Sequence, residues 1–446
     1  MSMLLLIFFS FLSGLATIAA PCIWPLLPII LSSTVSGGRR KPLGIVTGIG
    51  VSFMLATLFL SYLYPSSHGS GTQIRAASLV RMLAAREDVF LVVINREASL
   101  AGPEDSAMKE MCQDTLHVRT MLDSTTEPAS REREPVRMPI VECEASQVSK
   151  TLHAYVAKHQ IDGIFIFRIE TYFLAQLTLE QLPRRFMDLD ELTFRRSERI
   201  EDLKDMNGHR GRDMVRRRAI AVTRLLEAKV VSRFEKVFVS SKVEAAHGRE
   251  LAPDTIFHVL PNVVPSRALA WNLSARKSQE ILFVGTLSYY PNEDAVRFFC
   301  CEILPIIRQR LGDAVRLRVI GFDCPPELRS FASEGGIELL GYEKDLAVAY
   351  GTASLVVVPL RAGTGTRLKI LEAFAHGCPV VSTTIGAEGL NIVPDVHFLL
   401  ADDPEAFANA CVRILTNPAL AMELVREANE LQRRSYSLEN LIRCYD

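Results

Sequence analysis

Short apolar runs recur along most of this chain, and the stretches between them mix apolar and polar residues with helical spacing. A run that is apolar throughout, rather than at every second position, indicates a strand buried on both faces, as in a parallel sheet covered by helices. Alternation of such strands with helices predicts an α/β protein. The expected strands are residues 89–94, 136–141, 163–167, 186–189, 237–240, 257–260 and 354–359.

The N-terminal part of the chain has a different pattern. No charged side chain precedes Arg39, and a second uncharged stretch covers residues 42–68. Both stretches are long enough to cross a bilayer, which takes roughly 20 apolar residues. Residues 1–63 are therefore predicted to form a hydrophobic helical hairpin in a membrane. The basic run 39–41 favours a cytoplasmic position for the connection between the two spans, which would send both ends of the hairpin outward. A domain on the cytoplasmic side after the hairpin then requires that one span does not cross fully, that the basic run is overruled, or that the segment is an accidental fusion.

Composition narrows the class of protein. With 446 residues and 48% apolar content, the chain is expected to form two or three domains. A net charge of -1 gives no whole-chain case for binding nucleic acid. The nine cysteines have no zinc-like spacing, which favours a reducing compartment for most of the protein.

A glycine loop with charged residues follows the last expected strand. Gly363 and Gly365 precede a helical stretch over residues 367–376. Glycine lets the backbone approach an anion, and the first amides of a helix have no internal partner, so this turn suits phosphate. Arg367 and Lys369 add positive charge, and Glu372 can accept hydrogen bonds from ribose hydroxyls. The alternative is an ordinary turn before a solvated helix face with spaced charge pairs.

Further motifs stand around this loop in a fixed order: Phe283-Val284-Gly285-Thr286, Tyr290-Pro291-Asn292-Glu293-Asp294-Ala295, Gly341-Tyr342 and Ile385-Gly386-Ala387-Glu388-Gly389-Leu390. With them, residues 281–437 resemble the donor-binding half of family 4 glycosyltransferases. These are retaining enzymes of the GT-B fold, in which two Rossmann-like domains face a cleft.

The resemblance implies a nucleoside diphosphate sugar as donor and neither a metal nor another cofactor. It gives Arg367 and Lys369 the catalytic role of stabilising the leaving diphosphate. It places the donor against Gly285, Thr286, Gly363, Gly365, Thr366, Glu372, Glu388 and Gly389. The family often carries two glutamates separated by seven residues. Here Glu372 fits the second and Thr364 stands in place of the first, which leaves open the group that steadies the donor sugar.

The resemblance also predicts the domain boundaries: an acceptor-side Rossmann-like domain over residues 64–265 and the donor-binding domain over 280–446. Residues 436–446 are expected to return to the first domain. Residues 64–75 resemble the first glycine loop of these enzymes, so Gly69, Ser70 and Gly71 are expected to touch the diphosphate or the acceptor. A flexible linker of similar composition is the alternative.

Two segments of the first domain have alternative readings. Asp188-Leu189-Asp190-Glu191 offers hard carboxylate oxygens that suit magnesium or manganese. A related stretch ends a strand in the matching transferase subgroup, so we interpret it as structural or acceptor-side rather than as a metal site. Residues 195–233 are predicted to be an amphipathic helical region packed on the domain, or alternatively one that lies on anionic lipid.

Residues 11–28 and 44–63 resemble the first two helices of the thiol-disulfide transmembrane proteins of cytochrome c biogenesis. In that family Cys22 would be one member of a redox pair. A small buried cysteine in a membrane hairpin is the alternative. In the transferase family a strand normally precedes the first glycine loop, whereas here residues 58–63 of the apolar stretch take its place.

Together these features predict a retaining glycosyltransferase that moves a sugar from a nucleotide sugar to a glycan or lipid-linked acceptor hydroxyl. Residues 1–63 would anchor it to the membrane, with the catalytic domains on the cytoplasmic side, where nucleotide sugars are expected. The alternatives are a membrane thiol-disulfide protein and a sugar-nucleotide binding module without catalysis.

Overall fold

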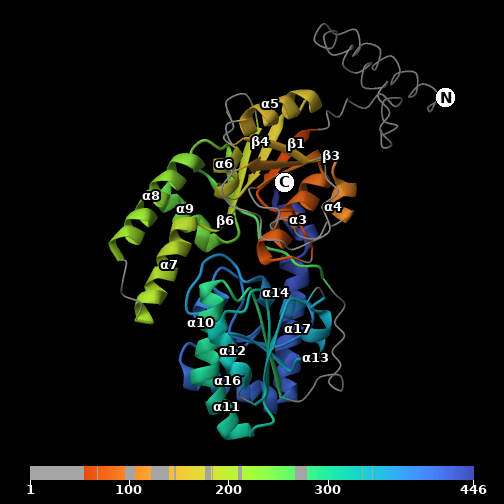
Figure 1. Cartoon of the computed structure of the whole chain (residues 1–446). Coiled ribbons are helices and arrows are strands. Elements are labelled where there is room, and N and C mark those ends of the chain that lie inside the picture. Colours follow the sequence, from red (N-terminus) through yellow and green to blue (C-terminus); the bar gives the residue numbers. More distant parts are fainter. Residues whose placement is uncertain are drawn as a thin grey trace, which may run out of the picture. The chain divides into compact units, whose positions relative to one another are not determined.

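The computed structural model describes residues 55–67, 69–95, 106–121, 140–144, 147–175, 182, 184–208, 213–266, 279–333, 335–343 and 345–445. From Leu55 onward the chain forms one compact unit. Within it the described residues form two open parallel sheets covered by helices, which we call the first and second lobes (Figure 1).

The first lobe contains an eight-stranded sheet in the order β4-β3-β2-β1-β5-β6-β7-β8, and its neighbouring strands are all parallel. The strands are β1 (Ala56–Ser61), β2 (Asp88–Asn95), β3 (Asp114–Met121), β4 (Ile140–Glu144), β5 (Gly163–Phe167), β6 (Arg184–Asp190), β7 (Lys236–Val239) and β8 (Phe257–Val259). The helices are α3 (Gly71–Ala84), α4 (Ser106–Met111), α5 (Val148–His159), α6 (Ile169–Ala175), α7 (Thr193–Met206), α8 (Asp213–Val231) and α9 (Lys242–Leu251).

The strand β1 lies at the centre of this sheet, between β2 and β5. Leu58 and Leu60 enter the core on one face of the sheet, and Phe59 enters the core on the other. The ring of Phe59 stacks on that of Phe165 in β5, with 5.6 Å between centroids. Helices cover both faces of the sheet, so the strand is buried from Thr57 to Ser61, which is why most of its residues are apolar.

The predicted helical hairpin is therefore wrong for its last residues, 56–63, which form β1 and the turn after it. A six-residue strand buried on both faces has the same hydropathy as the end of a membrane span, so composition alone does not separate them. This strand stands where the transferase family has one, so the first lobe begins before residue 64. No helix in the described part of the chain is long and apolar enough to cross a membrane. Residues 1–54, with Cys22, lie outside the described residues.

The second lobe contains a six-stranded parallel sheet in the order β11-β10-β9-β12-β13-β14. Its strands are β9 (Glu280–Val284), β10 (Arg316–Ile320), β11 (Ile337–Leu340), β12 (Leu355–Val358), β13 (Val380–Ser382) and β14 (Leu399–Leu400). Its helices include α10 (Tyr290–Phe298), a π-helical turn (Phe299–Ile303), α11 (Leu304–Leu311), α12 (Pro326–Arg329), α13 (Ala347–Thr352), α14 (Leu368–Ala375), α15 (Thr384–Ala387), α16 (Pro404–Thr416) and α17 (Pro418–Ser435).

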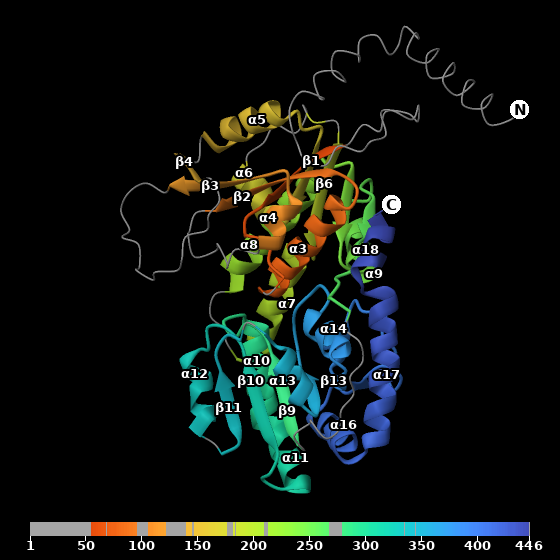
Figure 2. The same cartoon turned by 90° about the vertical axis from the view of Figure 1, so that its right-hand side faces the viewer.

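The chain passes between the lobes twice, and the two crossings are hydrogen-bonded to each other. Val264, after β8, donates its amide to the carbonyl of Tyr436, after α17, at 3.2 Å. The last helix, α18 (Leu438–Tyr445), then packs on the first lobe through Leu441, which is 1% exposed (Figure 2). The expected return of the C-terminal segment to the first domain is confirmed.

The expected amphipathic region forms α7 and α8, which pack against each other. The other face of α8 is open to solvent and carries apolar residues, among them Met214 at 84% and Leu225 at 72% exposed. Packing on the domain is confirmed for α7, whose Phe194 and Leu203 are buried. A position on anionic lipid stays a prediction.

Candidate active site

The second-lobe glycine loop joins β12 to α14 at the carboxyl edge of the sheet. Gly363 and Gly365 have φ of 117° and 71°, in the region that side chains with a Cβ rarely adopt. The chain can therefore make this turn only with glycine at both positions without strain. The loop residues 362–365 are buried, and α14 begins at Leu368, one residue later than expected.

The side chain of Arg367 fixes the shape of this loop. Only 9% of the residue is exposed, and its guanidinium donates hydrogen bonds to the carbonyls of Gly365, at 2.7 Å, and of Thr364. Those bonds direct the two carbonyls toward the guanidinium, so the loop surrounds a positively charged side chain. The alternative of a solvated charge-paired helix face is wrong, because Arg367 is buried and its partners are backbone atoms.

Lys369 lies one turn further along, beneath the loop after β9. Its ammonium donates to Oδ1 of Asn292 at 2.9 Å and lies 4.3 Å from the centre of the Phe283 ring. Burial, reinforced by the charge of Arg367, lowers the pKa of Lys369 to about 7. An anion bound beside Lys369 would raise this pKa again, because a nearby negative charge favours the protonated ammonium.

The residues expected to form the opposing wall of the donor pocket adjoin Lys369. A Cβ added at Gly285 would lie 2.9 Å from Nζ of Lys369, so this glycine keeps the backbone close to the ammonium. The carbonyl of Thr286 accepts from the Asn292 amide at 2.9 Å, which orients the Asn292 oxygen toward Lys369.

Glu372 is half-buried on the next turn of α14. Its Oε2 accepts from the hydroxyl of Tyr350 at 3.0 Å. Burial raises the pKa of Glu372, while the Tyr350 hydroxyl and Lys369 act in the opposite direction. The Tyr350 ring also stacks on His376, with 5.1 Å between centroids. The hydrogen bond from Tyr350 thus fixes the Glu372 carboxylate, a hydrogen-bond acceptor, close to Lys369. Its contact with ribose stays a prediction.

The first-lobe glycine loop meets the second lobe at the start of α14. A Cβ added at Gly71 would lie 3.2 Å from Cδ1 of Leu368. Ser70 donates its amide to Oε1 of Gln73 at 3.0 Å, and Gln73 donates to the carbonyl of Tyr64 at 3.2 Å. Gly69 precedes this cap and Gly71 opens α3, so the flexible-linker alternative is wrong for residues 69–71.

Glu388 and Gly389 also lie at the contact between the lobes. Arg199 of α7 donates to both carboxylate oxygens of Glu388, at 2.8 Å to Oε1, and to the carbonyl of Gly363 at 2.7 Å. Gly389 has φ of 81°, and a Cβ there would lie 3.0 Å from Oγ of Ser241. Burial alone would raise the pKa of Glu388, but Arg199 holds it below the ordinary value.

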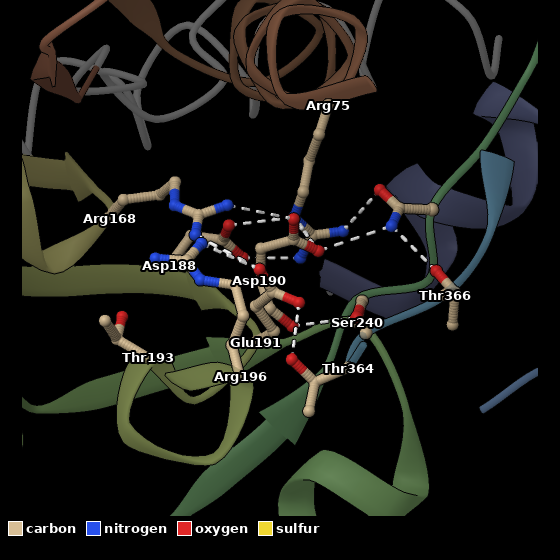
Figure 3. A network of polar contacts seen from close by, with 12 residues as sticks. Arg75, Arg168, Asp188, Asp190, Glu191, Thr193, Arg196, Ser240, Thr364 and Thr366 are labelled. Atoms are coloured by element: carbon tan, nitrogen blue, oxygen red, sulfur yellow. Dashed lines mark hydrogen bonds and ion pairs between the residues drawn. The ribbon is translucent and has the colours of Figure 1, made fainter. Parts of the chain in front are cut away.

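Two first-lobe carboxylates that sequence reasoning did not assign to the site reach the second-lobe glycine loop. Glu191 accepts from the Thr364 hydroxyl at 2.7 Å, as Figure 3 shows, and Glu244 accepts from the Gly365 amide at 3.4 Å. Both residues lie more than a hundred positions away from the loop in sequence. In the sequence, Glu191 was noted only as part of the Asp-x-Asp-Glu stretch, whose carboxylates were weighed as a metal site.

The two aspartates of that stretch contact arginines. Arg75 donates to both oxygens of Asp188, at 2.8 and 2.5 Å, and both residues are buried. Arg75 also lies against Asp190 (Figure 3). Asn262 donates to Asp190 at 3.3 Å and to the Thr366 hydroxyl at 2.7 Å. The stretch therefore connects β6 to the lobe contact through its two aspartates, and the interpretation of the stretch as structural or acceptor-side stays a prediction.

Residues 278–417 match the family model described as "Glycosyl transferases group 1". This segment is a group 1 glycosyl transferase domain. A search of curated proteins found no significant sequence match.

Several solved structures share the fold over most of the chain. One is sucrose-phosphate synthase from Thermosynechococcus elongatus, with 18% identity, a TM-score of 0.63 and coverage of 87% of this chain and 96% of the other. Another is Anabaena HepE in complex with UDP and glucose, with 12% identity, a TM-score of 0.57 and coverage of 87% and 97%. WaaG, a glycosyltransferase involved in lipopolysaccharide biosynthesis, has 15% identity, a TM-score of 0.57 and coverage of 86% and 98%.

These likenesses establish two Rossmann-like lobes of the GT-B kind. The finer assignment to family 4 and the cytochrome c biogenesis fragment stay predictions.

Proposed function

We propose that the protein is a retaining glycosyltransferase that moves a sugar from a nucleoside diphosphate sugar to an acceptor hydroxyl. The observation that carries the proposal is the set of groups at the carboxyl edge of the second sheet. There a glycine loop that contacts the first lobe, a buried Arg367 and the Lys369 ammonium stand together. Ligands of open parallel sheets bind beyond this edge.

Departure of the nucleoside diphosphate is the step that these groups serve. Negative charge grows on the diphosphate oxygens as the glycosidic bond breaks. Lys369 and the amide of Thr366, with the Gly365 amide once the diphosphate takes the place of Glu244 as its acceptor, would stabilise that charge more in the transition state than in the ground state. Arg367 holds the loop that carries these amides and adds its own charge. We assign the neutralisation of the diphosphate to these side chains and amides, and no resident metal to the site.

The proton of the acceptor hydroxyl needs a destination. In a retaining reaction the acceptor approaches from the face that the diphosphate leaves, so a leaving phosphate oxygen can take the proton. The new bond joins the acceptor oxygen to the anomeric carbon, and the nucleoside diphosphate departs with the proton. No side chain is assigned as general base.

The partners of the proposed reaction are a nucleotide sugar and a glycan or lipid-linked acceptor. The names of the neighbours support this class, since HepE was solved with UDP and glucose, and WaaG takes part in lipopolysaccharide biosynthesis. The first lobe would receive the acceptor. A cytoplasmic position of both lobes, where nucleotide sugars are made, belongs to the proposal, as does a membrane anchor within residues 1–54.

The test is a transfer assay on the full chain with radiolabelled nucleotide sugars and a panel of sugar and lipid-linked acceptors. We expect a product whose anomeric proton has the same configuration as the donor in the NMR spectrum. An inverted anomer would overturn retention. Donor binding without transfer or hydrolysis would favour a binding module, and no donor binding would overturn the proposal altogether.

A further inference from the structure

Glu191 immediately follows β6 and projects from the first lobe onto the glycine loop of the second. Its Oε2 accepts from Oγ1 of Thr364 at 2.7 Å, and a Cβ added at Gly365 would lie 3.1 Å from the same oxygen. The carboxylate therefore stands against the loop to which we assign the diphosphate. A sugar attached to a diphosphate bound by this loop would have its hydroxyls close to this carboxylate.

Two arginines hold the carboxylate in position from behind. Oε1 of Glu191 accepts from Arg196 at 2.9 Å and from Arg168 at 3.3 Å (Figure 3). Arg168 is 3% exposed and has φ of 66°, and Asp190 at the end of β6 has φ of 63°. Two adjacent strand ends thus adopt a backbone conformation that is rare for residues with a side chain. Such strain tends to occur where the surroundings fix a functional geometry.

The charge state of Glu191 suits an acceptor of hydrogen bonds. Burial alone would raise its pKa, but Arg168 and Arg196, with the Thr364 hydroxyl, hold the pKa below the ordinary value. An ionised carboxylate has about four lone-pair directions and no proton to donate. Three donors fill three of them, so one direction stays available for a ligand hydroxyl.

We propose that Glu191 accepts a hydrogen bond from a hydroxyl of the transferred sugar and so positions the sugar over the glycine loop. The inference rests on the proposed function, and it deepens it by naming the group that steadies the sugar. Thr364 carries no charge of its own, and the carboxylate at this place is brought by the other lobe. Sugar recognition then requires both lobes to be in contact.

The experiment compares nucleotide sugars with the same nucleotides lacking the sugar. Calorimetry on the full chain would use UDP-glucose, UDP-N-acetylglucosamine and GDP-mannose, each against UDP or GDP. For the pair that the wild type binds most tightly, we expect Glu191→Gln to weaken the nucleotide sugar at least tenfold, and the nucleoside diphosphate less than twofold. Loss of a hydrogen bond to a charged group has an effect of this size.

Two further variants keep the test decisive if Glu191→Gln folds poorly. Glu191→Asp keeps a negative charge beside the two arginines, but its shorter side chain withdraws the carboxylate from the glycine loop. We therefore expect the same selective weakening of nucleotide-sugar binding, with an unchanged melting temperature. Glu87→Gln is the matched control. Glu87 is a buried first-lobe carboxylate paired with Arg184 at 3.1 Å, at the opposite edge of the sheet, and its variant should bind both ligands as the wild type does.

The outcomes separate the two proposals. Equal weakening of both ligands in Glu191→Asp would assign Glu191 a structural role and overturn the inference, as would no weakening of either. If the wild type itself binds none of the nucleotide sugars, the proposed function fails and the inference falls with it.

Discussion

Lys369 combines a buried ammonium with a neighbouring arginine, and the result is a charge that depends on pH near neutrality. Burial, with a smaller contribution from repulsion by the Arg367 guanidinium, lowers the pKa of Lys369 to about 7, although Glu372 attracts the ammonium. A bound diphosphate would stabilise the protonated form and raise this pKa. Donor binding at neutral pH is therefore expected to take up a proton.

We predict that the affinity for a nucleotide sugar falls as the pH rises above 7. Below that pH Lys369 is already charged and the dissociation constant is flat. Above it, each pH unit weakens binding by up to about tenfold, until the pKa of the complex is reached. Calorimetric titration from pH 6 to 9 measures the slope. In Lys369→Met binding is weaker and the slope disappears, and a wild-type profile without slope would contradict the assignment.

Glu227 is a second buried titratable residue, and its hydrogen-bond partners lie in the first lobe. Its carboxylate accepts from the amides of Thr193 and Phe194 at the start of α7, at 2.9 and 3.2 Å. Burial raises its pKa from 4.5 to about 7, although these amides favour the charged form. Between these values the folded state keeps a proton that the unfolded state has released. Stability is therefore present below pH 4.5 and is lost as the pH rises toward 7.

We predict that Glu227→Gln reduces this loss, because the amide oxygen still accepts hydrogen bonds and carries no charge. The difference in unfolding free energy between pH 5 and pH 8 should shrink by about 1–3 kcal/mol. Urea unfolding at both pH values measures it. Glu235→Gln, a change at an exposed carboxylate of the same lobe, serves as control and should leave the difference as it is. An unchanged difference in Glu227→Gln would refute the burial effect.

Helix α7 is the element that connects the first lobe to the donor loop. Arg199 binds Glu388 and the Gly363 carbonyl, and Asn207, directly after the helix, donates to Asp294 at 2.7 Å and to the hydroxyl of Tyr290 at 2.9 Å. One helix thus contacts the second lobe at two places. Its position is expected to influence donor affinity without contact to the reacting atoms.

A double-mutant cycle tests this connection. Arg199→Ala and Glu388→Ala should each weaken nucleotide-sugar binding, and the double variant should lose less than the sum. The pair is about a quarter exposed on both sides, so we expect a coupling energy of only about 0.5–1 kcal/mol. Strictly additive losses would show that the ion pair does not contribute to the donor-binding arrangement.

At the level of elements, the apolar runs correctly located β2, β5, β6, β7, β8 and β12, while three further strands, β4, β3 and β1, were misjudged. The described part of 136–141 begins β4 only at Ile140, and β3 was missed because His117 and Arg119 interrupt its apolar pattern. The strand β1 was assigned to a membrane span, since its apolar run continues one. Local composition does not distinguish an apolar run that is covered by helices from one that is covered by lipid.

At the scale of the whole molecule, the proposed function has both lobes contact the same bound nucleotide sugar. A ligand that binds only the folded state stabilises it according to its concentration relative to the dissociation constant. We predict that a nucleotide sugar at 100 times its dissociation constant raises the unfolding free energy by about 2.7 kcal/mol. Thermal unfolding of the full chain with a nucleotide-sugar panel measures the shift, and free glucose serves as control. No shift with any nucleotide sugar at millimolar concentration would argue against a donor site.

The sequence by itself determined the local features: parallel strands in fully apolar runs, the turn that needs Gly363 and Gly365, and the helix after it. These follow from backbone sterics and burial within a few neighbouring residues. Only the tertiary structure placed Glu191 against Thr364, joined Arg199 to Glu388 and lowered the pKa of Lys369. Those properties depend on which residues, far apart in the chain, the packing of two lobes brings together, and on how much water that packing removes.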